Sequence, residues 1–298
     1  MTGYPHTVLD FEKEFITNEK CEEYLYKVKW PEGFVCPYCQ SKEFWKILKG
    51  YKCEKCKKKS SLTVGTIFQD SHKSLQFWFR AIWYITNQKN GMSANTLQNM
   101  LGIGSYKTAW ALMHKLRIAM VRPGRDKLSG IVEVDESYIG GGASGKRGRG
   151  ASNKALVLIA VEVNENKIGR IRLKVIPDAS YKSLSNAITE LVEKNSLIQT
   201  DGWPSYLGIK QNGLKHEVIK KTDSVGENLL PHCHLISSLL KRWLLGTHQG
   251  GVEASHLNYY LDEFTFRYNR RKSKSRGLLF HRLIEQAVLV KPVLIKNI

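Results

Sequence analysis

The sequence predicts an α/β protein of several domains, and three features predict it. Two Cys-x-x-Cys pairs near the amino terminus indicate a small metal-bound ribbon. Apolar residues recur at helical spacing after residue 74 and at strand spacing after residue 130. From these features we expect a helical lead-in at 1–29, a ribbon at 30–66, a helical segment at 67–124, and an α/β domain with basic C-terminal helices at 125–298.

The charge of the chain points to a polyanionic partner. Its 298 residues include 46 Lys and Arg against 27 Asp and Glu, a formal net charge of +19. Cations placed on phosphates release counterions, so we favour nucleic acid over an anionic membrane surface or a merely soluble basic protein. The sequence has no run of roughly eighteen apolar residues and no signal-peptide pattern, so we expect a cytosolic protein without a membrane partner.

Four of the six cysteines form two knuckles, "CPYC" (Cys36, Cys39) and "CEKC" (Cys53, Cys56). In a reducing cytosol, clustered cysteines are more often metal ligands than disulfides. Two such pairs can complete a tetrahedral structural Zn²⁺ site on a short β-ribbon. A redox dithiol would explain one pair but hardly two at this spacing.

Lysines surround both knuckles, so the ribbon could lie along a phosphate backbone. They are Lys42, Lys46, Lys49, Lys52, Lys55, Lys57, Lys58 and Lys59. The two remaining cysteines, Cys21 and Cys233, are expected to be small packed residues rather than ligands.

The helical segment begins with a serine cap at Ser74. The stretch "SANTLQNMLGIGSYKTAWALMHKLR" then predicts helix, turn and helix, with caps at Ser93 and Ser105. The second helix would turn polar residues outward, as a recognition helix in a major groove does. Those residues are Lys107, His114, Lys115 and Arg117. A helical bundle with a glycine turn and a basic outer face is the alternative.

The α/β domain opens with a β-branched strand, "GIVEVDESYIGG", that we expect to end near Asp135. A glycine-rich basic loop follows, and then two strands, "ALVLIAVEV" and "IGRIRLKVI", a helix, and a short strand closed by Asp201. Three strands, a helix and a strand are the beginning of a ribonuclease H-like fold. The expected domain is therefore a mixed sheet with flanking helices.

Asp135 and Asp201 would stand at the ends of adjacent strands and could face one point. Carboxylates there can hold two Mg²⁺ ions against a phosphate. One ion would activate a water or a 3′-hydroxyl, and the other would stabilise the leaving oxygen. Either aspartate alone could equally be a cap or a turn former.

Several motifs together resemble the zinc-ribbon-bearing DDE transposases of bacterial insertion sequences. They are "CPYC…CEKC", "GTIF", "VDESYIGG", "GKRGRG", "TDGWPSY", "LLKRWLLGTH" and "HLNYYLDEFTFRYNRR", spread over residues 30 to 275. The resemblance implies an enzyme that cuts double-stranded DNA at transposon ends and joins the 3′-hydroxyls to target DNA. It also implies a nucleoid-associated protein of bacteria that acts as a homodimer or higher oligomer, because two ends must be held together.

The same resemblance implies a third metal ligand, usually glutamate, on a helix with a lysine seven residues later. Lys241 fits that lysine, and the residue seven before it is His234. We hypothesise that His234 replaces the glutamate and favours Mn²⁺ over Mg²⁺, because Mg²⁺ prefers hard oxygen ligands. The alternatives are that His234 contacts a DNA phosphate, or that this copy is inactive.

Three further acidic residues lie near these motifs. Glu133 shares a strand face with Asp135 and is a spare ligand candidate, whereas Glu136 should point away. Glu263 more plausibly pairs with an arginine than with metal.

Arginines and lysines near the motifs are candidate DNA contacts, with solvated charge as the alternative in each case. Lys241 and Arg242 would lie near the scissile phosphate. The others are Lys146, Arg147 and Arg149 in the glycine-rich loop, and Arg267, Arg270 and Arg271 in "FRYNRRKSKSR".

Two other functions fit the sequence. One is a catalytically inactive, regulatory DNA-binding derivative that uses the ribbon and helices alone. The other is a nuclease that cuts without joining.

Overall fold

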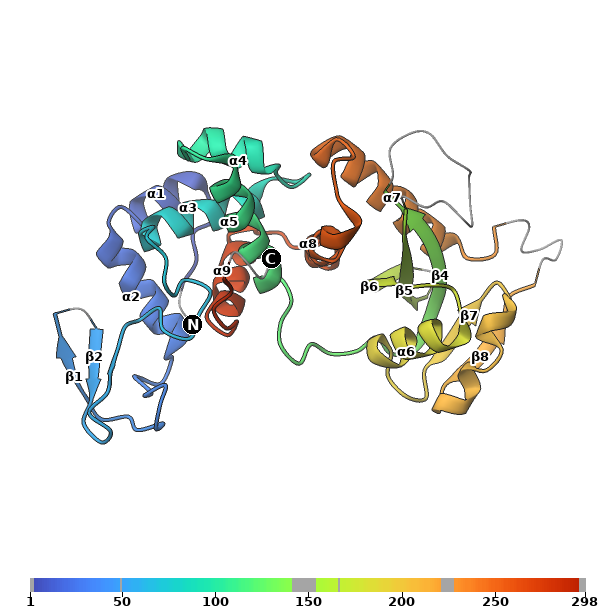
Figure 1. Cartoon of the computed structure of the whole chain (residues 1–298), viewed down its shortest axis with the longest axis horizontal. Helices are drawn as coiled ribbons and strands as arrows, with labels where there is room; N and C mark the ends of the chain where they lie inside the picture. The colour runs from blue at the N-terminus through green and yellow to red at the C-terminus, as the bar shows by residue number, and fades with distance from the viewer. Residues whose placement is uncertain (1–2, 49, 141–153, 166, 221–227, 295–298) are drawn as a thin grey trace. The chain divides into compact units, whose positions relative to one another are not determined.

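The structure, a computed structural model, describes residues 3–48, 50–140, 154–165, 167–220 and 228–294 (Figure 1). The chain forms two compact units. The first contains Met1–Gly124 and Lys272–Ile298, and the second contains Arg125–Arg271. No helix in these described ranges is both long and apolar enough to cross a lipid bilayer.

The first unit is mainly helical, and side-chain caps fix where several helices begin. Its helices are α1 (Val8–Glu14), α2 (Asn18–Lys29), α3 (Leu75–Asn87), α4 (Ala94–Leu101), α5 (Tyr106–Ala119) and α9 (Arg276–Ala287). Ser74 and Ser93 cap α3 and α4 as predicted, each accepting a backbone N–H. Gly102 ends α4 in the left-handed conformation and makes the predicted turn, but Ser105 makes no cap hydrogen bond.

An aromatic core holds the helices of the first unit together. Phe15 of the α1–α2 connection lies 5.0 Å from Phe79 and 5.5 Å from Phe280 between ring centroids. Phe11 stacks on Trp83 at 4.8 Å. Because Phe280 of α9 completes this core, α9 belongs to the first unit, whereas the sequence placed 272–298 with the α/β domain.

The zinc ribbon is a three-stranded antiparallel sheet of β1 (Phe44–Ile47), β2 (Gly50–Cys53) and β3 (Lys59–Ser60). Its inner side is aromatic, with Phe34 packed 4.7 Å from Phe44 and 5.3 Å from Tyr51. Phe34 also meets Trp30 at 4.9 Å, which attaches the ribbon to the end of α2.

The second unit is built on a five-stranded sheet in the order β6-β5-β4-β7-β8. The strands are β4 (Ile131–Ile139), β5 (Ala155–Asn164), β6 (Lys167–Ile176), β7 (Leu197–Thr200) and β8 (Lys215–Val218). The first three pair antiparallel, and β7 and β8 run parallel to β4. This mixed order confirms the predicted ribonuclease H-like fold.

Helices cover both faces of the sheet, and side chains alternate between them (Figure 1). Val132 and Val134 of β4 pack toward α6 (Tyr181–Leu191). Odd-numbered residues of β4 face α7 (Pro231–His248), and α8 (Leu257–Asn269) packs against β6 on the same face. Short 3-10 turns occur at Pro204–Tyr206, Ile209–Asn212 and Ala254–His256. Residues 133, 135 and 137 thus face the helix that carries the predicted third ligand.

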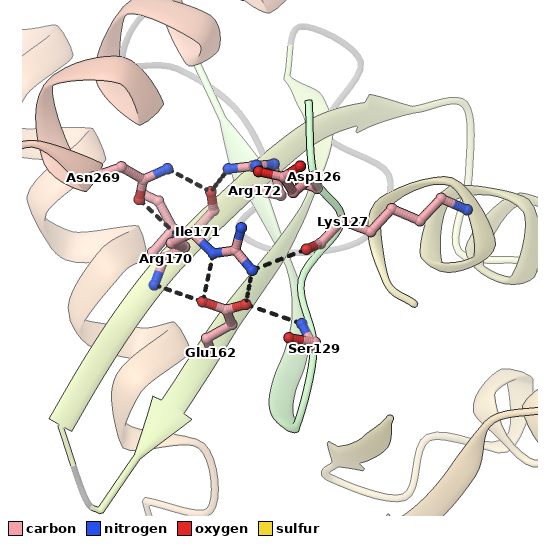
Figure 2. Close-up of polar contacts among 8 residues, drawn as sticks. All are labelled: Asp126, Lys127, Ser129, Glu162, Arg170, Ile171, Arg172 and Asn269. Carbon is pink, nitrogen blue, oxygen red and sulfur yellow. Dashed lines mark hydrogen bonds and ion pairs between the residues drawn. The ribbon is translucent and has the colours of Figure 1, made fainter. Parts of the chain in front are cut away.

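The segment that leads into β4 is hydrogen-bonded to side chains of β5 and β6 (Figure 2). Arg170 of β6 donates to both carboxylate oxygens of Glu162 on β5, at 2.6 and 2.9 Å. Glu162 also accepts the Ser129 backbone N–H at 2.9 Å, and Arg170 donates to the Lys127 carbonyl at 3.0 Å. These contacts fix the path of the chain into β4.

Two more residues in Figure 2 extend this network. Arg172 donates to the carbonyl of Asp126 at 2.8 Å. The side chain of Asn269, at the end of α8, accepts the N–H of Ile171 at 2.8 Å and donates to its carbonyl at 3.1 Å. Asn269 therefore occupies backbone groups on the outer edge of β6, where another strand could otherwise pair.

Candidate functional site

The four knuckle cysteines gather into one cluster. The sulfur atoms of Cys36, Cys39, Cys53 and Cys56 all lie within 4.8 Å of one another. In the described part of the chain, no other group of three or more histidine, cysteine, aspartate or glutamate residues has its ligand atoms this close together. Four sulfurs at this spacing suit tetrahedral Zn²⁺, which confirms the predicted structural zinc centre. Cys21 and Cys233 lie apart from it and are fully buried, as predicted.

Asp135 lies in the middle of β4, so the prediction that this strand ends near Asp135 is wrong. The strand continues because "ESYI" pairs with β5 as far as Ile139 opposite Ala155. Asp135 faces α7, and its side chain is 17% exposed. Pairing with the parallel strand β7 stops at Glu133 opposite Gln199, two residues earlier.

Asp201 directly follows β7, as predicted. Asp201 follows the end of the parallel strand next to β4, close enough that its charge helps to raise the pKa of Asp135. Asp201 is exposed, and one of its carboxylate oxygens accepts the Trp203 backbone N–H at 3.1 Å. The next residue, Gly202, has a φ of +84°, and a Cβ there would lie 2.6 Å from the Val218 side chain. Only glycine fits this turn.

His234 of α7 meets Asp135 from the opposite side. Its Nε2 lies 3.4 Å from Asp135 Oδ2. Its Nδ1 hydrogen-bonds Asn228 Oδ1, an atom that can only accept, so Nδ1 carries the proton. A neutral His234 would thus turn a lone pair toward a carboxylate oxygen. A proton or a cation between Nε2 and the carboxylate oxygen removes this repulsion.

The surroundings of Asp135 favour its neutral form. Burial raises the pKa of Asp135 to about 6, and the nearby charges of Glu136 and Asp201 add to the rise. His234 and the Glu136 backbone N–H act in the opposite direction. Partial burial lowers the pKa of Lys241, seven residues along α7, and the charge of Lys154 adds to this, whereas the charge of Asp135 acts in the opposite direction. Asp201, His234 and Lys241 thus all interact electrostatically with Asp135.

The neighbouring acidic residues have other partners. Glu133, the spare ligand candidate, binds the first turn of α7. Glu136 points to the opposite face, where it accepts a hydrogen bond from the buried Tyr206 hydroxyl, as its strand position predicts. Glu263 forms a 2.8 Å ion pair with Arg267, which confirms the predicted arginine partner.

Two polar contacts of α7 were missed from the sequence. Asn228 precedes α7 and carries no motif that would mark it as the partner of His234. Ser237 of α7 is buried and donates to Ser137 of β4 at 2.9 Å, a contact that joins the helix to the sheet. Glu133, Asp135 and Ser137 all share the face of β4 that meets α7. A period-two polar pattern within an apolar strand was the available signal.

The predicted DNA contacts differ in exposure. Lys107 and Arg242 are exposed and Lys115 is half-buried. His114 is fully buried and Arg117 is 2% exposed, so the prediction that both face outward is wrong. The side of α5 that carries His114 is itself buried, because Ala111, one turn earlier, also lies in the core. Lys146, Arg147 and Arg149 lie outside the described residues.

The C-terminal arginines of the predicted DNA surface contact their own unit. The Arg267 side chain is 11% exposed and paired with Glu263. Arg270 stacks on the Phe266 ring with 3.9 Å from Cζ to the ring centroid. Arg271 donates to the carbonyls of Ile168 and Gly169 on β6. Structural contacts therefore occupy at least part of the guanidinium groups of Arg267 and Arg271.

Fold and site together define a class of protein, a ribonuclease H-like domain accompanied by a four-cysteine zinc ribbon. A family model described as an ISXO2-like transposase domain matches residues 127–269, and one described as a transposase zinc-ribbon domain matches residues 16–59. Together they match more than half of the chain, which belongs to the zinc-ribbon-bearing, ISXO2-like DDE transposases. Such a domain implies a role in DNA transposition.

Known proteins are similar to this chain over between 45% and 86% of its length. An "Uncharacterized protein in transposable element ISH50" of Halobacterium salinarum is 25% identical over 279 residues, which cover 86% of this chain and 92% of that protein. The catalytic core of BIV integrase is 18% identical, with a TM-score of 0.31, over 45% of this chain and 81% of that chain. A pre-cleavage Mos1 transpososome is 11% identical, with a TM-score of 0.29, over 70% and 75%.

Proposed function

We propose that this chain cuts DNA at the ends of a transposable element and joins the freed 3′-hydroxyls to target DNA. The observation that carries the proposal is the meeting of Asp135 with two other candidate ligands. Asp201 directly follows the neighbouring parallel strand β7, and its charge helps to raise the pKa of Asp135. His234 Nε2 lies 3.4 Å from the Asp135 carboxylate. Two carboxylates and a neutral imidazole form a donor set for divalent cations.

The donor set fits Mn²⁺ better than Mg²⁺. When bound, paired divalent ions would activate the attacking oxygen and stabilise the leaving oxygen of an in-line phosphoryl transfer. Asn228 accepts a hydrogen bond from Nδ1 of His234, so Nε2 keeps its lone pair for a metal ion. Metal-binding histidines usually have such a partner on the other ring nitrogen. The three side chains do not all lie within 4.8 Å of one another. Asp201 is exposed, so its carboxylate can approach a bound cation by rotating about its side-chain bonds.

Product analysis tests the proposed function. The substrates are a linear DNA that carries one end of the element and a supercoiled target plasmid, with Mn²⁺ or Mg²⁺ present. A transposase gives cut ends and joined products. Cutting without joining would make the chain a nuclease, and binding without either would make it a regulatory derivative.

The raised pKa of Asp135 predicts that Asp135→Asn stabilises the metal-free protein at neutral pH. The free carboxyl titrates near 3.8 and the folded one near 6. The unfolded state therefore loses its proton first, and the free energy of unfolding falls as pH rises between these values. Asp135→Asn removes this penalty, so denaturant unfolding should show a gain of about 1–3 kcal/mol at pH 7.

The same comparison at pH 4 should show little gain, because the Asp135 carboxyl is then mostly protonated in the folded protein. Asp201→Asn is the matched control. Its side chain is exposed, asparagine can still accept the Trp203 N–H, and its charge is the smallest contribution to the raised pKa of Asp135, so we expect a change within about 0.5 kcal/mol. A gain at pH 7 no larger than that of the control would contradict the assignment of a costly charge to Asp135.

The outer face of the ribbon is a second DNA-contacting surface in this proposal. Cross-strand pairing places Trp45, Lys52 and Lys59 in one row across the three strands. Trp45 is 45% exposed, and Lys57 Nζ lies 4.5 Å from its ring centroid. A phosphate backbone suits such a row because its ammonium groups can neutralise successive phosphates.

Lys52→Gln combined with Lys59→Gln should weaken binding to duplex DNA of any sequence. Each lost phosphate contact lowers the slope of log K against log salt by about 0.9, so the double variant should lose about 1.8. Fluorescence anisotropy at several salt concentrations measures this slope. Lys13→Gln, on the exposed side of α1, is the control and should leave it unchanged. An unchanged slope in the double variant would remove the ribbon from the DNA surface.

A further inference from the structure

Helix α7 begins without a local cap. Its N-cap residue is Leu230, which makes no side-chain cap hydrogen bond, and its first helical residue is Pro231, which has no N–H. The first N–H bonded within the helix is that of His234, to the Leu230 carbonyl at 3.0 Å. The N–H groups of His232 and Cys233 therefore need acceptors from elsewhere.

Glu133 of β4 supplies both acceptors. Its Oε2 accepts the backbone N–H of His232 at 3.0 Å and that of Cys233 at 3.0 Å. Its Oε1 lies 2.6 Å from His232 Nδ1. The Glu133 side chain is only 6% exposed, so these contacts replace water almost completely. A carboxylate at the start of a helix also meets the positive end of the helix dipole.

The cap connects the two elements that hold the candidate ligands. Glu133 and Asp135 project from the same face of β4, and the residues that Glu133 binds directly precede His234. A slip of α7 by one residue would move His234 by about 1.5 Å along the helix axis and about 100° around it. The 3.4 Å approach of His234 to Asp135 would not survive such a slip.

We propose that Glu133 is a positioning residue, which caps α7 from β4 and thereby holds His234 in register with Asp135. The inference rests on the proposed function, because it assigns Glu133 to a site that binds divalent cations through His234. Glu133 itself would not bind the cation, since its oxygens are already hydrogen-bonded to α7.

The first experiment measures the cap without any catalytic cation. Hydrogen–deuterium exchange of the 230–236 segment is compared in zinc-loaded wild type, Glu133→Gln and Glu133→Ala. Glutamine keeps the shape and one oxygen that can accept both backbone N–H groups, but it removes the negative charge at the start of the helix and the second carboxylate oxygen beside His232, so exchange should accelerate moderately. Alanine removes both acceptors and should accelerate it more. Exchange equal to that of wild type in both variants would refute the cap.

The second experiment measures positioning. Mn²⁺ binding to the zinc-loaded full chain is titrated by calorimetry, well below the unfolding temperature of each variant. Loss of a residue that orients a metal ligand weakens affinity about ten- to a hundred-fold, and we expect this range for Glu133→Gln. Because glutamine preserves volume, the test stands even if Glu133→Ala fails to fold.

Ser237→Ala is the matched control. It removes a 2.9 Å hydrogen bond between α7 and β4 without touching the first turn, so Mn²⁺ affinity should stay at the wild-type value. If exchange is faster in Glu133→Gln but Mn²⁺ affinity is unchanged, Glu133 caps α7 but does not position His234, and the proposal is overturned. If His234→Ala binds Mn²⁺ as wild type does, the proposed function fails at His234, and accelerated exchange in the Glu133 variants would still report the cap separately.

Discussion

His234→Ala should abolish DNA cutting and joining, whereas His234→Glu should retain them and shift the preferred cation from Mn²⁺ to Mg²⁺. Alanine removes the Nε2 that lies 3.4 Å from the Asp135 carboxylate. We expect a loss of at least about a hundred-fold in the rate of cutting, since loss even of a residue that supports a metal ligand costs up to that factor in affinity or activity. Glutamate restores a hard oxygen ligand, which Mg²⁺ prefers.

The measurement is the initial rate of strand cutting with each cation for the three proteins. His256→Ala is the control, because His256 belongs to the same unit but lies at the 3-10 turn before α8 and pairs with Glu253. Undiminished cutting by a folded His234→Ala protein would rule out the ligand role. Cutting that fails in His234→Glu as well would favour a phosphate contact, which a carboxylate would repel.

Loss of zinc should unfold the ribbon and leave the second unit intact. The three strands of the ribbon have two to four residues each, and such a small sheet depends on its metal for stability. Zinc binding supplies an apparent free energy of about 10–16 kcal/mol in comparable small domains. Cys56→Ser, or chelation of the wild type, should therefore remove exchange protection from residues 36–60.

Zinc content by atomic absorption and exchange measured in both units make this test specific. Ser41→Ala, near the first knuckle but outside the sulfur cluster, should keep one zinc per chain and full protection. The sheet that carries Asp135 lies in the other unit and should exchange as in wild type. A ribbon that stays protected after its zinc is gone would mean that the aromatic side around Phe34 holds it without metal.

Features set by local sequence were predictable. The cysteine spacing identified the zinc centre, and Ser74 and Ser93 were recognised as caps because a cap bonds to backbone only three residues away. The β-branched and alternating runs identified β4, β5 and β6. The predicted order along the chain, three strands, a helix and a strand, matches β4, β5, β6, α6 and β7. Asp201 was placed correctly because "DG" after a short apolar run ends a strand.

Features set by contacts between distant segments were not predictable. Glu133 meets α7 across 99 residues of sequence, and no local pattern relates the two. Phe280 joins an aromatic core formed by the first helices of the chain, so the domain boundary could not be placed from the C-terminal sequence alone. Arg271 was assigned to DNA because its charge is visible in the sequence, whereas the β6 carbonyls that it binds are not.

The polar network at the entrance to β4 has a mechanical consequence. Three residues of this segment, Asp126, Lys127 and Ser129, bond to Arg172, Arg170 and Glu162 of the sheet (Figure 2). The residue between them, Leu128, donates its backbone N–H to the carbonyl of Leu191 at the end of α6. Tension that reaches the second unit through the chain at residue 125 would be shared among β5, β6 and the end of α6. Asp135 lies further along β4, so tension that enters at residue 125 acts on these attachments before it acts on Asp135.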